Sequence, residues 1–275
     1  MSVQIPAASP GEMAVPSAAA ADSIALHGVD IAYEREGQEP LLVVENCSLS
    51  VGREEFVAIV GPSGCGKSTV LRAISGLLRP TRGKVLIHGN EVVGHPAGVG
   101  FMFQRDTLLP WCSVEENIAI GLELSGNPQK DPQATIRDLV QLLGLNGFEK
   151  SYPSALSGGM RQRVSLGRLL AYHPDVMLMD EPFGALDSLT KAVLGRELLR
   201  IWEAERRSIV FVTHDIEEAV YLADRVVVFS PRPGRIVAQH RIDIPRPREA
   251  RAIRSDPRFT HICEQIWDDL KLPTH

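Results

Sequence analysis

The sequence predicts an α/β fold in which helices cover both faces of a largely parallel sheet. Short apolar runs of the buried-strand type alternate with segments whose apolar residues recur at helical spacing. A Gly-rich loop at 61–69 lies between one such run and the next helical segment. A mostly helical stretch at 105–170 interrupts the alternation, so we expect it to form an inserted lobe.

The N-terminal half is expected to begin with strands. Their sequences are "SIALHGVDIAY" at 23–33, "LLVVENCSLSV" at 41–51 and "EFVAIV" at 55–60. A helix over 68–78 follows the Gly-rich loop, and a turn beginning with "RPTRG" leads into a strand at 84–89. A further strand, "GVGFMFQ" at 98–104, ends in a glutamine.

The remaining elements continue the alternation after the helical stretch. Within that stretch, "SVEENIAIGLEL" and "DPQATIRDLVQLLGL" are the clearest amphipathic segments, and Ser113 with Glu116 has the spacing of a capping box. The runs "DVMLMD" and "SIVFVT" are typical of buried strands, and "LTKAVLGRELLRIWEAE" between them is typical of a helix. Two more strands are predicted at "RVVVFS" and "RIVAQHRIDI".

The composition excludes several classes of protein. The formal net charge is −5, so no general basic field indicates a nucleic-acid partner. The four cysteines have no CxxC or Cys/His spacing, which argues against a zinc site or a disulfide framework and fits a reducing cytosol. A transmembrane helix needs roughly 20 largely apolar residues, and the sequence contains no such run.

The two ends of the chain differ from the rest in composition. Residues 1–22 are rich in Ala, Pro and Ser but lack a Lys/Arg start and a leucine-rich run, so we expect a disordered leader rather than a secretory signal. The tail from 231 is rich in Arg and Pro. We expect a solvated surface arm there, with a contact to anionic lipid or a regulator as the alternative.

The Gly-rich loop has the pattern G-x-x-x-x-G-K-[ST] between a strand and a helix. Small residues let backbone N–H groups close around phosphates, and the positive end of the next helix dipole faces the same charge. Lys67 would reach the β- and γ-phosphates, and the Ser68 hydroxyl would bind Mg²⁺. The predicted nucleotide-binding residues of the loop are Gly61, Pro62, Ser63, Gly64, Cys65, Gly66, Lys67, Ser68 and Thr69.

A second motif, "DVMLMDEP", indicates hydrolysis. Its apolar strand delivers Asp180 to a position where a carboxylate can orient the Mg²⁺ shell. Glu181 comes next and is the candidate to polarise water. A GTPase would need a guanine-reading "NKxD" run, and a kinase would need a pocket for an acceptor hydroxyl. Neither signal is evident.

A third motif, "SALSGGMRQRV" at 154–164, places Ser157, Gly158 and Gly159 at a helix start, where a hydroxyl and bare amides can hold an anion. With this motif the sequence resembles the ATP-binding cassette (ABC) ATPases of ABC transporters. "LSGGMRQRV" resembles their signature motif, and the match continues through "DEPFGALD" and "VTHD". The resemblance covers about residues 23–245.

The resemblance implies a definite architecture. It consists of a P-loop NTPase (RecA-like) core with a mixed sheet, an antiparallel β subdomain and an inserted α-helical subdomain at about 105–165. The ATPase domain would span 23–245, followed by a C-terminal extension at 246–275.

The resemblance also implies a head-to-tail dimer. In the family, the signature helix of each copy contacts the γ-phosphate held by the Gly-rich loop of the other copy. Ser157, Gly158 and Gly159 would therefore bind nucleotide in trans, and Asp187 would lie in the loop that crosses the interface. Two distant phosphate sites meet most simply through a two-fold axis. Arg161 and Arg163 are expected to support the signature helix.

Further roles follow from positions that match the family motifs. Gln104 matches the glutamine that contacts the metal and the attacking water, and His214 matches the histidine that contacts the γ-phosphate. Tyr33 matches the aromatic residue that stacks on adenine, with a half-buried strand tyrosine as the alternative. Catalysis would thus rest on Glu181, His214, Gln104 and Lys67, with Mg²⁺ held by Ser68, Gln104 and Asp180.

Three positions carry further expectations. Glu54 stands where the family usually has glycine, so we expect a different turn before the loop strand. Gly167 stands where alanine is commoner, which should weaken its helix by up to about 1 kcal/mol. Cys65 lies inside the phosphate loop, so we expect its alkylation to inhibit hydrolysis and Mg·ATP to protect it.

The stretches "RDTLLPWCSVEENIAIGLEL", "DEPFGALDSLT" and "VVFSPRPGRI" resemble the nitrate/sulfonate/taurine branch of importers. That branch implies separate membrane permease subunits, a solute-binding protein, a small anionic or zwitterionic cargo and a peripheral place on the cytoplasmic face of the inner membrane. The alternatives are a thiamine-precursor importer, a soluble ABC ATPase acting on nucleic acid or ribosomes, and a degenerate nucleotide-sensing scaffold. The scaffold is disfavoured because Glu181 and His214 are both present.

Overall fold

The computed structural model describes residues 22–126 and 131–271. Its larger sheet has six strands in the order β10-β9-β3-β8-β7-β6. Their bounds are Ile236–Arg241 (β10), Arg225–Phe229 (β9), Phe56–Val60 (β3), Ser208–Val212 (β8), Val176–Asp180 (β7) and Val99–Met102 (β6). Neighbouring strands are parallel except β10, which runs antiparallel to β9. The predicted mixed sheet is therefore confirmed.

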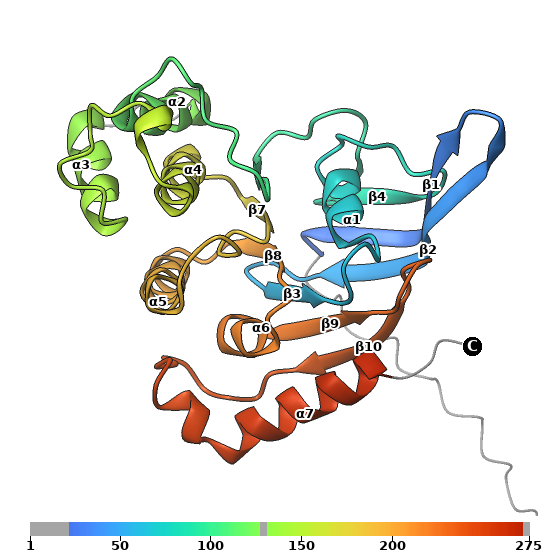
Figure 1. Cartoon of the computed structure of the whole chain (residues 1–275). Coiled ribbons are helices and arrows are strands. Elements are labelled where there is room, and N and C mark those ends of the chain that lie inside the picture. The colour runs from blue at the N-terminus through green and yellow to red at the C-terminus, as the bar shows by residue number, and fades with distance from the viewer. Residues whose placement is uncertain (1–21, 127–130, 272–275) are drawn as a thin grey trace, which may run out of the picture.

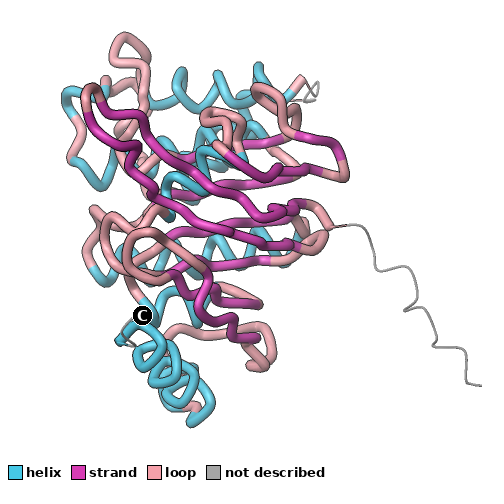
Figure 2. The backbone as a smooth tube through the Cα atoms, turned by 90° about the vertical axis from the view of Figure 1, so that its right-hand side faces the viewer, coloured by secondary structure: helices cyan, strands magenta, loops and turns pink. Residues whose placement is uncertain are grey.

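A second sheet of four antiparallel strands has the order β2-β1-β4-β5. Its strands are β1 (Ile24–Arg35), β2 (Gln38–Val51), β4 (Arg82–Ile87) and β5 (Asn90–Glu91). Figure 2 shows strands running side by side across the near side of the molecule, with helices behind them. The four-stranded sheet corresponds to the antiparallel β subdomain that the resemblance implied.

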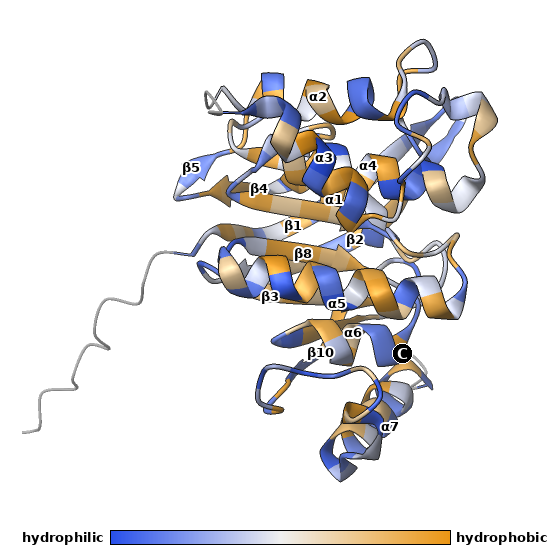
Figure 3. Cartoon of the chain, turned by 90° about the vertical axis from the view of Figure 1, so that its left-hand side faces the viewer, coloured by the Kyte–Doolittle hydropathy of each residue, from blue (hydrophilic) through white to orange (hydrophobic). Residues whose placement is uncertain are grey.

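The strand β3 divides the hydrophobic core. Val57 and Ile59 pack in one cluster with helix α1 (Lys67–Ile74) and the four-stranded sheet. The alternate residues Phe56, Ala58 and Val60 pack in the other cluster, because successive strand side chains point to opposite faces. Helices α5 (Ser188–Ala204), α6 (Ile216–Leu222) and α7 (Pro257–Lys271) contribute to that second cluster. Figure 3 shows hydrophilic and hydrophobic residues alternating along these helices.

The interrupting stretch forms a helical lobe beside the sheets (Figure 1). It contains α2 (Val114–Ser125), α3 (Pro132–Leu142), a 3-10 turn (Pro153–Ala155) and the start of α4 (Gly158–Tyr172). The predicted capping box is confirmed, since Glu116 N donates to Ser113 Oγ at 3.3 Å and Ser113 N donates to Glu116 Oε2 at 2.6 Å. These bonds satisfy amides that the first turn of α2 leaves unpaired.

Two unusual positions have a structural reason. Glu54 has φ 60°, so the turn keeps the left-handed conformation that favours glycine, and its backbone N–H donates to Ser208 Oγ. A Cβ at Gly167 would lie 2.8 Å from Leu143 Cδ1 and 3.2 Å from Ile118 Cδ1. The glycine therefore lets α4 pack closely against the lobe, a benefit that helix propensity alone does not reveal.

The C-terminal segment packs against the domain, so the predicted solvated arm is wrong for residues 231–271. Arg246 donates to Asp224 Oδ1 at 2.9 Å, and its guanidinium lies 4.4 Å from the centre of the Trp202 ring. Arg248 is only 6% exposed. Helix α7, which the sequence reading missed, buries Phe259 and Ile266. Arg246 and Arg248 are thus hydrogen-bonded within the fold rather than solvated.

The expected leader at 1–22 lies outside the described residues except for Asp22. Across residues 22–126 and 131–271, no helix combines the length and the apolar character needed to cross a membrane.

Candidate functional site

The Gly-rich loop connects β3 to α1 and forms one wall of a cleft of about 480 Å³. Gly66 caps α1 with φ 108°, a conformation that side chains rarely adopt. Lys67 Nζ donates to Gly61 O at 2.7 Å and to Pro62 O at 3.0 Å, which holds the ammonium against the loop. The predicted site residues that line the cleft are Tyr33, Ser63, Gly64, Gly66, Lys67, Ser68, Thr69, Gln104 and Glu181.

The end of β7 places a carboxylate beside α1. Ser68 Oγ donates to Asp180 Oδ1 at 2.8 Å, although the two residues are far apart in the chain. Asp180 is 3% exposed, and this burial raises the pKa of its carboxyl group, with the charge of Glu181 adding to the effect. A cation beside the carboxylate would favour its ionised form.

Glu181 has a left-handed backbone conformation, with φ 46°. Strain of this kind at a non-glycine residue is common at functional sites. Gln104 Nε2 donates to Glu181 Oε2 at 3.1 Å, and His214 Nδ1 lies 3.3 Å from the same oxygen. Two side chains that follow β6 and β8 therefore converge on one carboxylate oxygen of Glu181, which follows β7.

The signature residues lie elsewhere in the molecule. Ser157 caps α4 and accepts a hydrogen bond from Met160 N at 3.2 Å. Ser157, Gly158 and Gly159 are not among the residues that line the cleft. Asp187 caps α5 by accepting bonds from Leu189 N and Thr190 N, and the Thr190 hydroxyl holds its pKa below the usual range.

The two signature arginines support the helix as predicted. Arg161 donates to Asp106 at 2.9 Å and to the carbonyl oxygen of Leu156. Arg163 donates to the carbonyl oxygens of Leu143 and Gly144. Both guanidinium groups therefore join α4 to the rest of the lobe.

Comparison with known proteins assigns this site to a family. The family described as ABC transporter matches residues 44–184, which include the Gly-rich loop, the signature motif and Glu181. The chain belongs to the ABC transporter family. It is an ABC ATPase.

Relatives and solved structures agree with this assignment. An uncharacterized ABC transporter ATP-binding protein of Methanocaldococcus jannaschii is 50% identical over 83% of this chain and 84% of its own length. The taurine import ATP-binding protein TauB of Burkholderia thailandensis is 45% identical over 90% of this chain and 96% of its own length. A dimeric ATP-binding cassette bound to ADP and Pi matches with a TM-score of 0.73 and 29% identity, over 81% of this chain and all of that one.

The sequence reading missed one residue that positions this ABC site. Gln162 is 5% exposed, and its Nε2 donates to the main-chain oxygen of Gln104 at 2.6 Å. This hydrogen bond joins α4, the signature helix, to Gln104, whose side chain contacts Glu181. The only sequence signal was the position of this polar residue within the signature motif.

Cys65 is less accessible than its place in the loop suggested. Its side chain is 1% exposed, and burial raises the pKa of the thiol. The thiolate is the reactive form, so alkylation should be slow in the folded ABC domain. That alkylation of Cys65 inhibits hydrolysis, and that Mg·ATP protects the thiol, stays a prediction.

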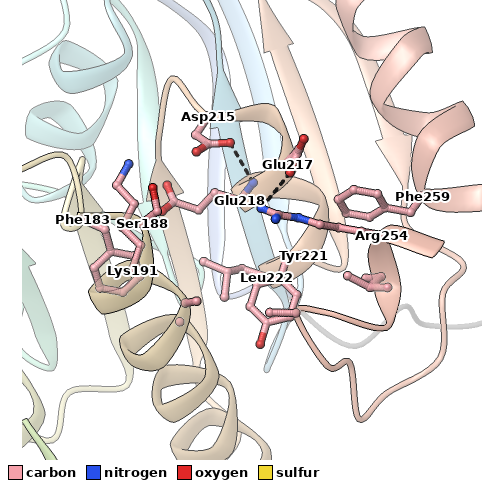
Figure 4. A pocket seen from close by; sticks show the side chains of 14 residues that line it. Phe183, Ser188, Lys191, Asp215, Glu217, Glu218, Tyr221, Leu222, Arg254 and Phe259 are labelled. Carbon is pink, nitrogen blue, oxygen red and sulfur yellow. Dashed lines mark hydrogen bonds and ion pairs between the residues drawn. The ribbon is translucent and has the colours of Figure 1, made fainter. Parts of the chain in front are cut away.

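A second cavity, of about 150 Å³, lies where the C-terminal segment packs on α5 and α6 (Figure 4). Arg254 pairs with Glu217 at 3.0 Å across this contact. Asp215, which directly follows His214, caps α6 by accepting a bond from Glu218 N. Burial raises the pKa of the Glu218 carboxyl group, which accepts a hydrogen bond from Thr213. The C-terminal segment thus packs on the helix that follows His214.

Proposed function

We propose that this chain is the ATP-hydrolysing subunit of an ABC importer that takes up a small anionic or zwitterionic solute of the taurine, sulfonate or nitrate type. The convergence of Gln104 and His214 on Glu181, beside the Ser68–Asp180 pair, carries the hydrolytic assignment. The likeness to TauB, which is named for taurine import, supports the class of cargo.

The Ser68–Asp180 pair fits Mg²⁺. A hydroxyl and a carboxylate 2.8 Å apart supply the hard oxygen ligands that this ion prefers, and Gln104 adds an amide oxygen nearby. Within the described parts of the chain, no group of three or more His, Cys, Asp and Glu side chains could hold a metal. Nucleotide phosphates and water would complete such a shell. When bound, the ion would neutralise charge on the transferring phosphoryl group.

Glu181 would accept a proton from the attacking water, because its carboxylate lines the cleft opposite the Gly-rich loop. Gln104 would hold both the carboxylate and the water in place, and His214 would bind the γ-phosphate. Lys67 would exchange its bonds to the loop carbonyls for bonds to phosphate oxygens. Most of the catalysis would come from positioning and charge stabilisation.

A head-to-tail dimer would complete the site. Ser157 and Gly158 lie exposed at the start of α4 and outside the cleft of their own chain, as residues that act in trans should. Bare amides and a hydroxyl at a helix start are suited to bind the phosphate of a partner. The match to a dimeric cassette supports this assembly.

The helical lobe would dock separate permease subunits. A groove of about 310 Å³ lies between β6, α2 and α4, and Leu124 on its rim is 69% exposed. Trp111 of the same lobe is 71% exposed. Apolar exposure of this kind is typical of a protein interface. The subunit would then sit peripherally on the cytoplasmic face of the membrane and serve a solute-binding protein.

The substitution Glu181→Gln tests the hydrolytic assignment. We expect ATP binding to persist while phosphate release falls at least about a hundredfold, because the proton acceptor is removed. The variant should also elute as a dimer in the presence of Mg·ATP. Glu264→Gln, on the exposed side of α7, is the matched control and should hydrolyse ATP normally. Near-normal turnover in Glu181→Gln would refute the assignment, and normal taurine uptake by cells carrying it would refute the transport role.

A further inference from the structure

The turn between β9 and β10, residues 230–235, packs directly on the Gly-rich loop. Gly234 N donates to Val43 O at 2.8 Å, and Gly234 O accepts from Glu45 N at 3.0 Å. A Cβ at Gly234 would lie 2.1 Å from Cys65 O, so only glycine permits this approach. The turn is therefore in contact with both β2 and the loop that would hold phosphate.

Side-chain bonds hold this turn in place. Arg235 pairs with Glu45 of β2 at 2.7 Å. Ser230 Oγ accepts from Arg235 N at 3.0 Å, and the Ser230 hydroxyl donates to the main-chain oxygen of Pro231. The backbone on either side of Arg232 is thus fixed by contacts that do not involve Arg232 itself.

Arg232 extends from this turn into the nucleotide cleft. It lines the cleft together with Ser63 and Lys67. Its Nε donates to Gly64 O at 3.2 Å, which places the guanidinium over the loop. Among residues 22–126 and 131–271, its two terminal amino groups have no hydrogen-bond acceptor and no ion-pair partner. Four N–H donors are therefore free to bind a ligand in the cleft.

The charges around the cleft favour an anion at this position. Lys67 and Arg232 are the cations among its described lining residues, and Glu181 is the carboxylate. The Lys67 ammonium has loop carbonyls as acceptors, whereas the outer edge of the Arg232 guanidinium has no acceptor among the residues that the structure describes. A guanidinium fork matches the geometry of phosphate oxygens, to which it can donate two parallel bonds.

We infer that Arg232 is a further nucleotide ligand, which binds the phosphate chain from the side of the β9–β10 turn. This inference rests on the proposed nucleotide site. It adds a cation that lies outside the Gly-rich loop, the signature motif and "DVMLMDEP", in the stretch "VVFSPRPGRI" of the C-terminal half of the domain. Alternatively, Arg232 would only donate a hydrogen bond to the Gly64 carbonyl oxygen. In that role it would stabilise the folded loop but would not increase the affinity for nucleotide.

The test is the dissociation constant for ADP, measured by titration calorimetry on the full-length protein. Arg232→Gln removes the charge, Arg232→Lys keeps it without the fork, and Arg235→Gln is the matched control at the same turn. We expect Arg232→Gln to weaken ADP binding about tenfold, the size of one charge-assisted contact. Arg232→Lys should recover part of the loss, and Arg235→Gln should stay within about twofold because its ion pair is exposed.

Two further readouts separate ligand binding from loop support. The difference between wild type and Arg232→Gln should shrink as KCl is raised, since salt screens an exposed charge. The melting temperature without nucleotide should be the same for both. Equal ADP affinity in wild type and Arg232→Gln, or an equal loss in Arg235→Gln, would overturn the inference. If wild type itself fails to bind ADP, the proposed function fails instead.

Discussion

Replacement of Arg248 by Met tests whether the C-terminal segment stabilises the ABC domain. The guanidinium donates to five carbonyl oxygens, which belong to Val220, Tyr221, Ala223, Ile242 and Ile244. The first three of these lie at the end of α6, whose last carbonyls have no partner within the helix. Arg248 therefore caps α6 and ties it to the chain that follows β10.

The expected loss of stability in Arg248→Met follows from two opposing contributions. Five hydrogen bonds from a charged group contribute roughly 7 kcal/mol in total. Burial and the neighbouring charge of Arg246 lower the pKa of Arg248 to about 10, so keeping the guanidinium charged in the folded protein costs about 3 kcal/mol. The difference predicts that Arg248→Met lowers the free energy of unfolding by about 4 kcal/mol. For a domain of this size, the melting temperature should fall by roughly 8 to 16 °C.

Urea unfolding, followed by far-UV circular dichroism, measures this loss. Arg251→Met is the control, because Arg251 is exposed and its replacement should change stability by less than about 0.5 kcal/mol. Arg248→Lys should fall between the two, since three donors cannot replace five bonds. A loss below about 1 kcal/mol in Arg248→Met would show that the buried arginine does not stabilise the domain.

Three other substitutions or reactions probe buried positions. Burial raises the folded-state pKa of Glu218 above its unfolded value, so its ionisation destabilises the fold progressively as pH rises through the folded pKa. The difference in unfolding free energy between Glu218→Gln and wild type should therefore be more favourable to the variant at pH 8 than at pH 5. The same difference at both pH values would contradict this reasoning. Mass spectrometry after brief iodoacetamide treatment at pH 8 should find Cys112 modified before the buried Cys65, and the reverse order would show that the loop opens readily. Gly167→Ala should lower the unfolding free energy by about 1 kcal/mol, because overpacking exceeds the gain in helix propensity, and a more stable variant would contradict the crowding seen at this position.

The strand and helix order of the core could be predicted because it depends on local pattern. The run "FVAIV" is apolar at every position and is buried at every position, as a central strand requires. Helix α7 was missed because the Arg- and Pro-rich stretch before it suggested solvent. Its apolar residues Phe259, Cys263, Ile266 and Leu270 nevertheless recur at helical spacing, which is the signal that could have revealed it.

The candidate site also has features that the sequence predicts and features that depend on tertiary packing. The Gly-rich loop and the Asp180–Glu181 pair are continuous in sequence, so their residue types alone indicate a phosphate site and a metal-side carboxylate. The convergence of Gln104 and His214 on one oxygen of Glu181 depends on three strands that end at the same edge of the sheet. Family resemblance implied their roles, whereas the packing shows how they meet.

The sequence by itself determined the α/β pattern, the Gly-rich loop and the adjacent carboxylates Asp180 and Glu181, because neighbouring residues and short periodicities decide strands, helices and tight turns. Only the tertiary structure decided what the arginines of the C-terminal half do. Arg246 pairs with Asp224, Arg248 caps α6, and Arg232 lines the cleft beside the Gly-rich loop. The surroundings of a charged side chain depend on segments that are distant in the chain. Composition does not indicate which of these segments packs beside that side chain.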